Sequence, residues 1–176
     1  MEHERYVRWV NSSHALGRIE PFLIPVIQGL GRLDVSLIIG DKRFAELHEE
    51  TRNTIEEATN LTDRITYSYL WVLGSYELIR TLDQRCRENP RLLDNHLANK
   101  INETKQSFER LRIPLAKLEP SRRHRDTDSP IAYPAIHERM GISWHVSNVF
   151  ISRRELSDAL LALFEEIANT LGAYAA

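Results

Sequence analysis

RITYSYLWVLGSYELIRTLDQRCRE, residues 64–88, is the stretch that decides the fold. Apolar side chains occur nearly all round a helix drawn through it, so other elements must cover it on several sides. Gly74 and Ser75 interrupt the stretch and cost about 1 kcal/mol of helix propensity, which the close approach of a neighbouring helix explains best. The stretch therefore predicts the central helix of a mainly α protein.

The amino-terminal segments predict their secondary structure less clearly. Residues 4–10 predict a short helix, and the side chains of residues 11–13 (Asn-Ser-Ser) are suited to capping the element that follows. Residues 33–39 form a short apolar run that suits either a helix or a strand, and we favour a helix.

Between these segments and the central stretch, apolar residues recur at steps of three and four as far as Ile65. Asp41 is a plausible N-cap for this periodic segment. No glycine or proline lies between Asp41 and Leu73, so residues 42–88 are compatible with one long helix. The polar residues around Asn60 nevertheless favour two helices with a break there.

Two prolines mark the elements after the central stretch. Asn89 and Pro90 predict a turn, and Pro90 is well placed to begin the next helix. Pro114 predicts that this helix breaks or kinks after Leu111.

Before its last helix the chain contains a polar, non-helical segment. Residues 120–140 form a polar connection, and a long connection inside a compact domain is usually functional or disordered. Residues 142–151 contain two β-prone runs, which predict a short β-hairpin. Ser152 and Glu155 have the spacing of a capping box, so a last helix begins there.

We expect residues 1–176 to form a single helical domain, a mainly α bundle of four to six helices with the polar connection and the hairpin before the C-terminal helix. The apolar content of 42% and the charged content of 27% are those of a soluble globular protein. The formal net charge of −2 does not indicate a dedicated nucleic-acid binder, although local basic patches leave room for nucleic-acid contact.

Composition also bears on location. Cys86 is the single cysteine, which excludes an internal disulfide and favours a reducing cytoplasm. The most apolar window, residues 21–39, contains Gln28, Arg32 and Asp34, which argues against a membrane span. The amino-terminal residues lack the basic and apolar regions of a secretory signal. We therefore predict a cytoplasmic protein that has no membrane contact and needs no cofactor.

Residues 121–146 combine three of the seven histidines with arginines, carboxylates and aromatic rings. This segment is the predicted ligand or partner surface. Its candidate residues are Arg122, Arg123, His124, Arg125, Asp126, Asp128, Tyr133, His137, Trp144 and His145.

A metal site is one interpretation of this segment, because His124, His137 and His145 offer the nitrogen donors that zinc, iron or manganese accept. The spacing matches neither an HExxH helix nor a calcium-binding loop. The arginines around His124 would repel a cation and pair with the neighbouring carboxylates. A salt-bridged surface loop is therefore the favoured interpretation.

Arginine and histidine also recur at a spacing of Arg-X4-6-His, in Arg8–His14, Arg43–His48, Arg91–His96 and Arg139–His145. This spacing is similar to the motif of the HEPN (higher eukaryotes and prokaryotes nucleotide-binding) helical domains, many of which are metal-independent ribonucleases. The resemblance implies an arginine that binds a phosphate and a histidine that moves protons during attack by a 2′-hydroxyl. In none of the four pairs is the arginine followed by the polar residue that many members of that family show.

The resemblance assigns the catalytic roles to Arg91 and His96, at the start of a bundle helix, or else to Arg139 and His145. The leading hypothesis is nevertheless a protein that acts by association, as a homo-oligomer or as a component of an assembly, through residues 121–146. An exposed strand edge at residues 142–146 would need covering, and a partner strand is one way to cover it. The helical nuclease and the metal-binding protein are the two alternatives.

Overall fold

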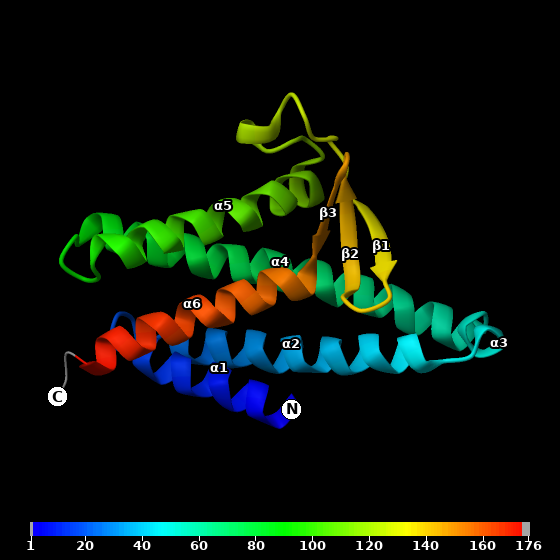
Figure 1. The fold of residues 1–176 in the computed structure, drawn as a ribbon, viewed down its shortest axis with the longest axis horizontal. Coiled ribbons are helices and arrows are strands. Elements are labelled where there is room, and N and C mark those ends of the chain that lie inside the picture. The colour runs from blue at the N-terminus through cyan, green and yellow to red at the C-terminus, as the bar shows by residue number, and fades with distance from the viewer. Residues whose placement is uncertain (1, 174–176) are drawn as a thin grey trace.

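The computed structural model describes residues 2–173 and confirms a mainly α fold with a small antiparallel sheet before the last helix (Figure 1). Within these residues the elements are α1 (Glu2–Leu16), α2 (Leu23–Glu46), α3 (Glu49–Arg52), α4 (Ile55–Glu88), α5 (Asn95–Lys117), the 3-10 turn η1 (Arg122–His124), β1 (Tyr133–His137), β2 (Gly141–Val146), β3 (Val149–Ser152) and α6 (Arg153–Ala173).

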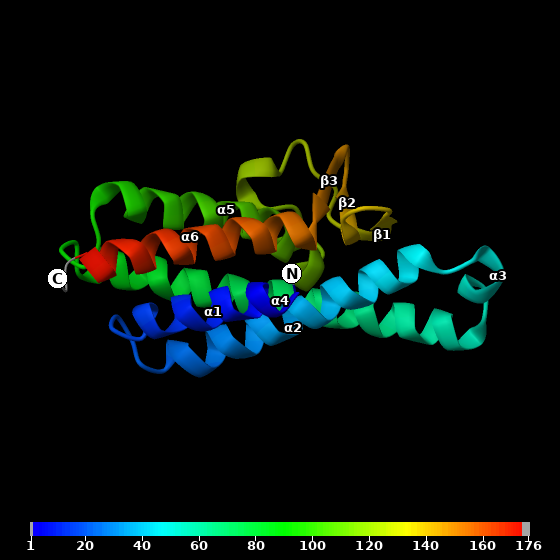
Figure 2. The same ribbon diagram turned by 60° about the horizontal axis from the view of Figure 1, so that its bottom comes forward.

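Helix α4 is the central helix, as its sequence predicts. It packs against α2 and α5, while α6 packs against α1 and α5. Figures 1 and 2 show that the end of α2 and the beginning of α4 extend together beyond α6 and meet at α3. The sheet has the strand order β1-β2-β3, and its central strand contacts α2, α4, α5 and α6. The sheet therefore lies over the region where these four helices come together.

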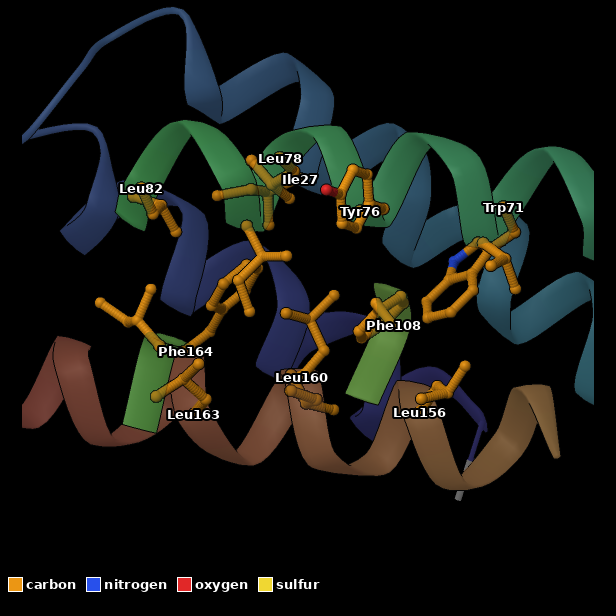
Figure 3. Close-up of a cluster of buried hydrophobic side chains, with 14 of the residues drawn as sticks. Ile27, Trp71, Tyr76, Leu78, Leu82, Phe108, Leu156, Leu160, Leu163 and Phe164 are labelled. Atoms are coloured by element: carbon orange, nitrogen blue, oxygen red, sulfur yellow. The ribbon is translucent and has the colours of Figure 1, made fainter. Parts of the chain in front are cut away.

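The core is continuous from α1 to the sheet. The three tryptophans of the chain, Trp9, Trp71 and Trp144, are all buried within it. Figure 3 shows side chains of α4 and α6, among them Leu78 and Leu160, meeting in one apolar layer. Each fully buried side chain of this size contributes about 1.5–3 kcal/mol, so the layer holds α6 firmly on the bundle.

Gly74 lies where α2 approaches α4. A Cβ at Gly74 would lie 3.2 Å from Leu30 Cδ2, which is tighter than ordinary van der Waals contact. One turn earlier, the indole nitrogen of Trp71 donates a hydrogen bond to the Leu30 carbonyl oxygen over 3.0 Å. The predicted close approach of a neighbouring helix is confirmed, and that helix is α2.

The first helix is longer than predicted. Residues 11–13 do not cap a new element but lie inside α1. Ser13 Oγ donates to the Val10 carbonyl oxygen over 2.6 Å and accepts from Gln28 Nε2 over 3.1 Å, so its hydroxyl is satisfied within and between helices. The prediction that residues 33–39 are helical is confirmed, because they form the middle of α2.

The predicted break near Asn60 is wrong, and so is the predicted N-cap at Asp41, which lies inside α2. Threonine hydroxyls on either side of Asn60 donate to carbonyl oxygens four residues back, which lets these polar residues sit inside a helix. The chain turns instead between α2 and α4, where Thr54 Oγ1 accepts from the Glu57 amide over 3.3 Å as the N-cap of α4.

The predicted turn at Asn89 and Pro90 is confirmed, because α4 ends at Glu88, but the helix start at Pro90 and the break at Pro114 need correction. Helix α5 begins at Asn95, not at Pro90, because Asp94 caps it by accepting from the Leu97 amide over 2.8 Å. Pro114 does not end α5, which continues to Lys117. Pro114 begins the last turn, so only one hydrogen bond near the helix end is lost.

The polar connection is partly a strand. Residues 133–137 form β1, which pairs with β2 in the antiparallel register Tyr133↔His145 to His137↔Gly141. Strand β2 is therefore the central strand, and the expectation that residues 142–146 expose an edge is wrong. The capping box is confirmed, since Ser152 Oγ accepts from the Arg154 amide over 3.0 Å and the Ser152 amide donates to Glu155 over 3.4 Å.

Within residues 2–173, one helix passes a test of length and apolar composition for crossing a membrane, and that helix is α2. This is weak support for a span, because a core helix of a soluble protein passes the same test. Helix α2 packs against α1 and α4 and carries the buried, ion-paired Asp34. Packing in the bundle accounts for part of this composition, since about a third of the apolar window is buried.

Candidate functional site

A buried charge network joins α1, α2 and α6 around Asp34. Its carboxylate accepts hydrogen bonds from Arg5 Nε over 2.6 Å, Arg153 Nη1 over 2.7 Å, Ser157 Oγ over 2.6 Å and Trp9 Nε1 over 3.1 Å. Asp34 has no exposed surface, and Arg153 is only 1% exposed. Because every acceptor site of the carboxylate is used, the network is built to hold a negative charge inside the bundle.

The electrostatics agree with this geometry. Burial alone would raise the pKa of the Asp34 carboxyl, but the guanidinium groups of Arg153 and Arg5 outweigh that effect and lower the pKa below its ordinary value. Asp34 is therefore ionised at neutral pH, and its role is to position both arginines.

A second carboxylate, Asp41, is largely buried two turns further along α2, and its contacts with arginines are longer than those of Asp34. Its Oδ1 is 3.6 Å from Arg64 Nε and its Oδ2 is 3.5 Å from Arg153 Nη2. These distances permit ion pairing but exceed ordinary hydrogen bonds. No hydrogen bond reaches Asp41 Oδ2, Arg64 Nε, Arg64 Nη2 or Arg153 Nε among the described residues.

Gly141 covers the Asp41 carboxylate from the sheet side. Its φ of +69° lies in the left-handed region, and a Cβ at this position would overlap the carboxyl group and Cβ of Asp41. Glycine is thus required for the turn and for the close approach. The turn between β1 and β2 therefore packs directly against α2.

Two cavities of about 380 Å³ each open on the two sides of this contact. Both are lined by Asp41, Ala45, Glu138 and Gly141. We call the first the α6-side cavity; its further lining is Ile38, Lys42, Glu46, Arg139, Met140, Arg153 and Arg154. We call the second the α4-side cavity; its further lining is Phe44, Arg52, Arg64, Ile136 and His137.

Burial shifts the pKa values of both charged groups at this contact. It raises the pKa of the Asp41 carboxyl above its ordinary value, although Arg153, Arg64 and a hydrogen bond from the Ile142 amide act in the opposite direction. It lowers the pKa of the Arg64 guanidinium, which Asp41 and Glu57 only partly offset. The pair is therefore incompletely compensated, in contrast to Asp34.

A separate surface lies on the outer side of the sheet. Tyr133, His145 and Phe150 occupy one row across β1, β2 and β3, so their side chains share one face. The imidazole of His145 lies 5.0 Å from the Phe150 ring, and that of His137 lies 5.5 Å from it. We call Tyr133, His137, His145 and Phe150 the sheet face, and Tyr133 is 57% exposed on it.

The structure thus brings three of the predicted surface residues together and removes others from the surface. Trp144 is only 1% exposed and belongs to the core, because it lies on the inner side of β2. Asp128 is also buried, since its carboxylate accepts two hydrogen bonds of 2.8 Å from Arg110. Arg110 lowers the pKa of that carboxyl below its ordinary value. Asp128 therefore anchors the connection and is not a free ligand.

The remaining candidates lie in and next to η1. Arg122, Arg125 and Asp126 are exposed, and Arg123 donates to the Gln106 side chain. Arg122, Arg123 and His124 line a small cavity of about 110 Å³ with residues of α5. The connection is thus a surface loop, but the ion pair that Asp128 makes comes from Arg110 of α5 and not, as the sequence predicted, from the arginines around His124.

The histidines do not assemble a metal site. His137 and His145 meet at Phe150, whereas His124 lies in η1. Within residues 2–173, no group of three or more His, Cys, Asp or Glu side chains is placed to hold a metal ion. His137 Nδ1 accepts from the Arg139 and Met140 amides over 3.2 Å each, so this nitrogen is engaged in the turn.

All four residues of the two arginine–histidine pairs are exposed. Arg91 lies in the turn before α5, whereas His96 is 70% exposed in the first turn of α5 and lies 3.5 Å from Glu166. Arg139 lies in the turn between β1 and β2, and His145 is near the other end of β2. In the described residues, no hydrogen bond or ion pair joins either arginine to its histidine.

The sequence interpretation missed the Asp34 and Asp41 contacts. In the sequence, Asp34 stands out only as a charge in an apolar window, and Arg153 lies inside the capping box without a role of its own. An aspartate within the apolar run of a helix was the available signal, because a buried charge requires a partner. The partners come from residues 5, 64 and 153, whose positions no local spacing reveals.

Comparison with known protein families, characterised proteins and solved structures found no match to this chain.

Proposed function

We propose that the protein acts by association in the cytoplasm and that two copies of the chain meet through the sheet face. The observation that carries this proposal is the cluster of exposed aromatic and imidazole rings on the outer side of the sheet. Aromatic rings are enriched at the centres of protein interfaces because they bury a large area and keep a polar tip.

A second copy of the chain suits this face because the charges beside it are complementary. Glu138 and Arg139, both exposed, occupy the turn next to His137. Under a two-fold axis, Glu138 of one protomer can approach Arg139 of the other. A face with mixed charge meets its own copy without the repulsion that a patch of one sign would create.

The geometry supports packing of face on face over the addition of a strand. Strand β1 is an edge of the sheet, but Pro134 in its second position lacks an N–H group. A proline on an edge strand blunts the backbone ladder that a partner strand would need. Side chains of the sheet face therefore supply the contact.

Light scattering over a range of protein concentrations tests the proposal. We expect a dimer for the wild type and a shift toward monomer for Tyr133→Ser, because removal of a central aromatic side chain typically costs an interface about 2 kcal/mol or more. A wild type that stays monomeric at every concentration would overturn self-association.

Phe22→Ser is the matched control. Phe22 is 81% exposed at the start of α2 and is not part of the sheet or its turns. Its loss removes a comparable aromatic surface elsewhere. If Phe22→Ser dissociates the dimer and Tyr133→Ser leaves it intact, the sheet face is not the interface.

A further inference from the structure

The imidazole of His137 closes the turn between β1 and β2. Its Nδ1 accepts hydrogen bonds from the backbone amides of Arg139 and Met140, each over 3.2 Å. An imidazole nitrogen accepts a hydrogen bond only while it carries no proton, so the closed turn requires neutral His137 with its hydrogen on Nε2. Two backbone donors of an exposed turn therefore depend on a single lone pair of a side chain that can be protonated.

We infer that protonation of His137 opens this turn and so makes the edge of the sheet face sensitive to acid. Histidine is the side chain whose charge changes between about pH 5 and 8. A proton on Nδ1 replaces the acceptor by an N–H group that points at two other N–H groups. Because protonation and closure exclude each other, the open form of the turn binds the proton more tightly, and acid shifts the population toward it.

The charges around His137 do not offset this loss. They belong to the turn itself, to the walls of the α4-side cavity that His137 also lines, and to β2 across the Phe150 ring. The groups are Glu138, Arg139, Asp41, Arg52, Arg64 and His145. Three arginines stand against two carboxylates, and Asp41 is already beside Arg64 and Arg153. The surroundings therefore do not favour an added positive charge on the imidazole.

The turn contacts two helices, so its opening has effects beyond residues 138–140. Gly141 packs against Asp41 of α2, and the Met140 carbonyl oxygen accepts a hydrogen bond from Ser152 Oγ, at the start of α6, over 3.4 Å. The His137 ring lies 5.5 Å from the ring of Phe150 on the sheet face. An open turn no longer holds His137 in this position, and the sheet face then loses one of its four rings.

Amide hydrogen exchange, measured by NMR at about pH 7.5 and about pH 5, tests the inference on either side of the range in which histidine titrates. Each rate is compared with that of an unstructured peptide at the same pH, which removes the direct effect of pH on exchange. We expect the protection of the Arg139 and Met140 amides to fall about tenfold or more at the lower pH, while protection within α4 stays unchanged. Equal protection of the turn at both pH values overturns the inference.

Three variants assign the response to His137. His137→Asn keeps an acceptor, because Oδ1 can bind the same amides but does not titrate, so the turn should stay protected at both pH values. His137→Leu removes the acceptor and should leave the two amides unprotected at both. His145→Asn is the matched control: it removes the other imidazole beside Phe150 and should lose protection in acid as the wild type does.

Thermal unfolding of each variant separates opening of the turn from loss of folding. If folded His137→Asn loses protection in acid like the wild type, another group is the sensor and the inference is overturned. Asp41 is the nearest alternative, because burial raises the pKa of its carboxyl and Gly141 packs against it. A response that disappears in His145→Asn overturns the inference as well.

The consequence for association rests on the proposed sheet-face dimer and is measured separately. Light scattering at the same two pH values should show a dissociation constant that rises about tenfold or more in acid for the wild type, and by less for His137→Asn. An equal rise in both proteins would show that the turn does not regulate the sheet face. A wild type that is monomeric at the higher pH would overturn the association itself, whereas the exchange measurement decides the opening of the turn in either case.

Discussion

Arg153 Nη1 lies 2.7 Å from Asp34 Oδ1, which joins the first residue of α6 to the middle of α2 across 119 positions of sequence. The same carboxylate holds Arg5 of α1 over 2.6 Å. Asp34 thus joins three helices that contribute much of the core. The guanidinium of Arg153 also lies near Asp41, with 3.5 Å between Nη2 and Oδ2.

The first prediction is that Asp34→Ala destabilises the fold by about 3–5 kcal/mol, because Arg5 and Arg153 are left as uncompensated buried charges. Urea unfolding measures the change. Asp158→Ala is the control, since Asp158 also binds Arg5 but is about half exposed; its loss should cost about 1 kcal/mol or less. Equal effects of the two substitutions would show that burial of the Asp34 network is not what makes it important.

The second prediction concerns the pH dependence of stability at Asp41. The folded pKa of this carboxyl is raised, so the folded state retains the proton above about pH 3.9, where the unfolded chain begins to release it. Wild-type Asp41 is therefore a stabilising group below that pH, and this contribution is lost as the pH rises through the folded pKa.

Asp41→Asn removes this titration. Relative to the wild type, the variant should gain unfolding free energy as the pH rises from about 3.9 to the folded pKa of Asp41. Urea unfolding at a series of pH values measures the difference between the two curves. A difference that falls with rising pH would mean that the arginines outweigh burial and that the pKa is lowered.

The sequence predicts the fold class because it depends on local periodicity. The apolar positions of residues 64–88 and the capping box at Ser152 lie within single elements, and both predictions hold. The break at Asn60 fails because a polar residue can be satisfied inside a helix by bonds that propensity does not describe.

The candidate site is predicted less completely, for a different reason. The segment 121–146 does contain the sheet face and the turn over Asp41. The residues beneath that turn, Asp41 and Arg64, lie in helices whose sequences gave no sign of a site. Contacts over such separations depend on the packing of α2 against α4, which spacing alone does not reveal.

The third prediction concerns the connection before β1. Arg110 holds Asp128 by two hydrogen bonds of 2.8 Å and so fastens residues 121–132 to α5. We expect Arg110→Gln to increase hydrogen exchange within residues 121–132, while exchange in α4 and α6 stays as in the wild type. Arg125→Gln, a change at an exposed arginine of the same segment, should leave exchange unaltered. Protection that is identical in both variants would show that the ion pair is not the anchor.

The fourth prediction tests whether the turn between β1 and β2 depends on its contact with α2. Gly141→Ala should destabilise the fold by about 1–3 kcal/mol, because alanine is strained at a φ of +69° and its Cβ overlaps the buried Asp41 side chain. Gly29→Ala is the control: no atom lies within 4 Å of a Cβ at that helical position, so alanine should stabilise the fold by about 0.5–1 kcal/mol. Urea unfolding measures both changes.

A double-mutant cycle separates the two causes at Gly141. In an Asp41→Ala background the overlap with the carboxyl group is gone while the backbone strain remains, so Gly141→Ala should cost less there than in the wild type. If the cost is the same in both backgrounds, backbone strain in the turn alone explains it, and the contact between Gly141 and Asp41 contributes nothing. A smaller cost would establish that the sheet and α2 are coupled through the contact of Gly141 with this carboxylate.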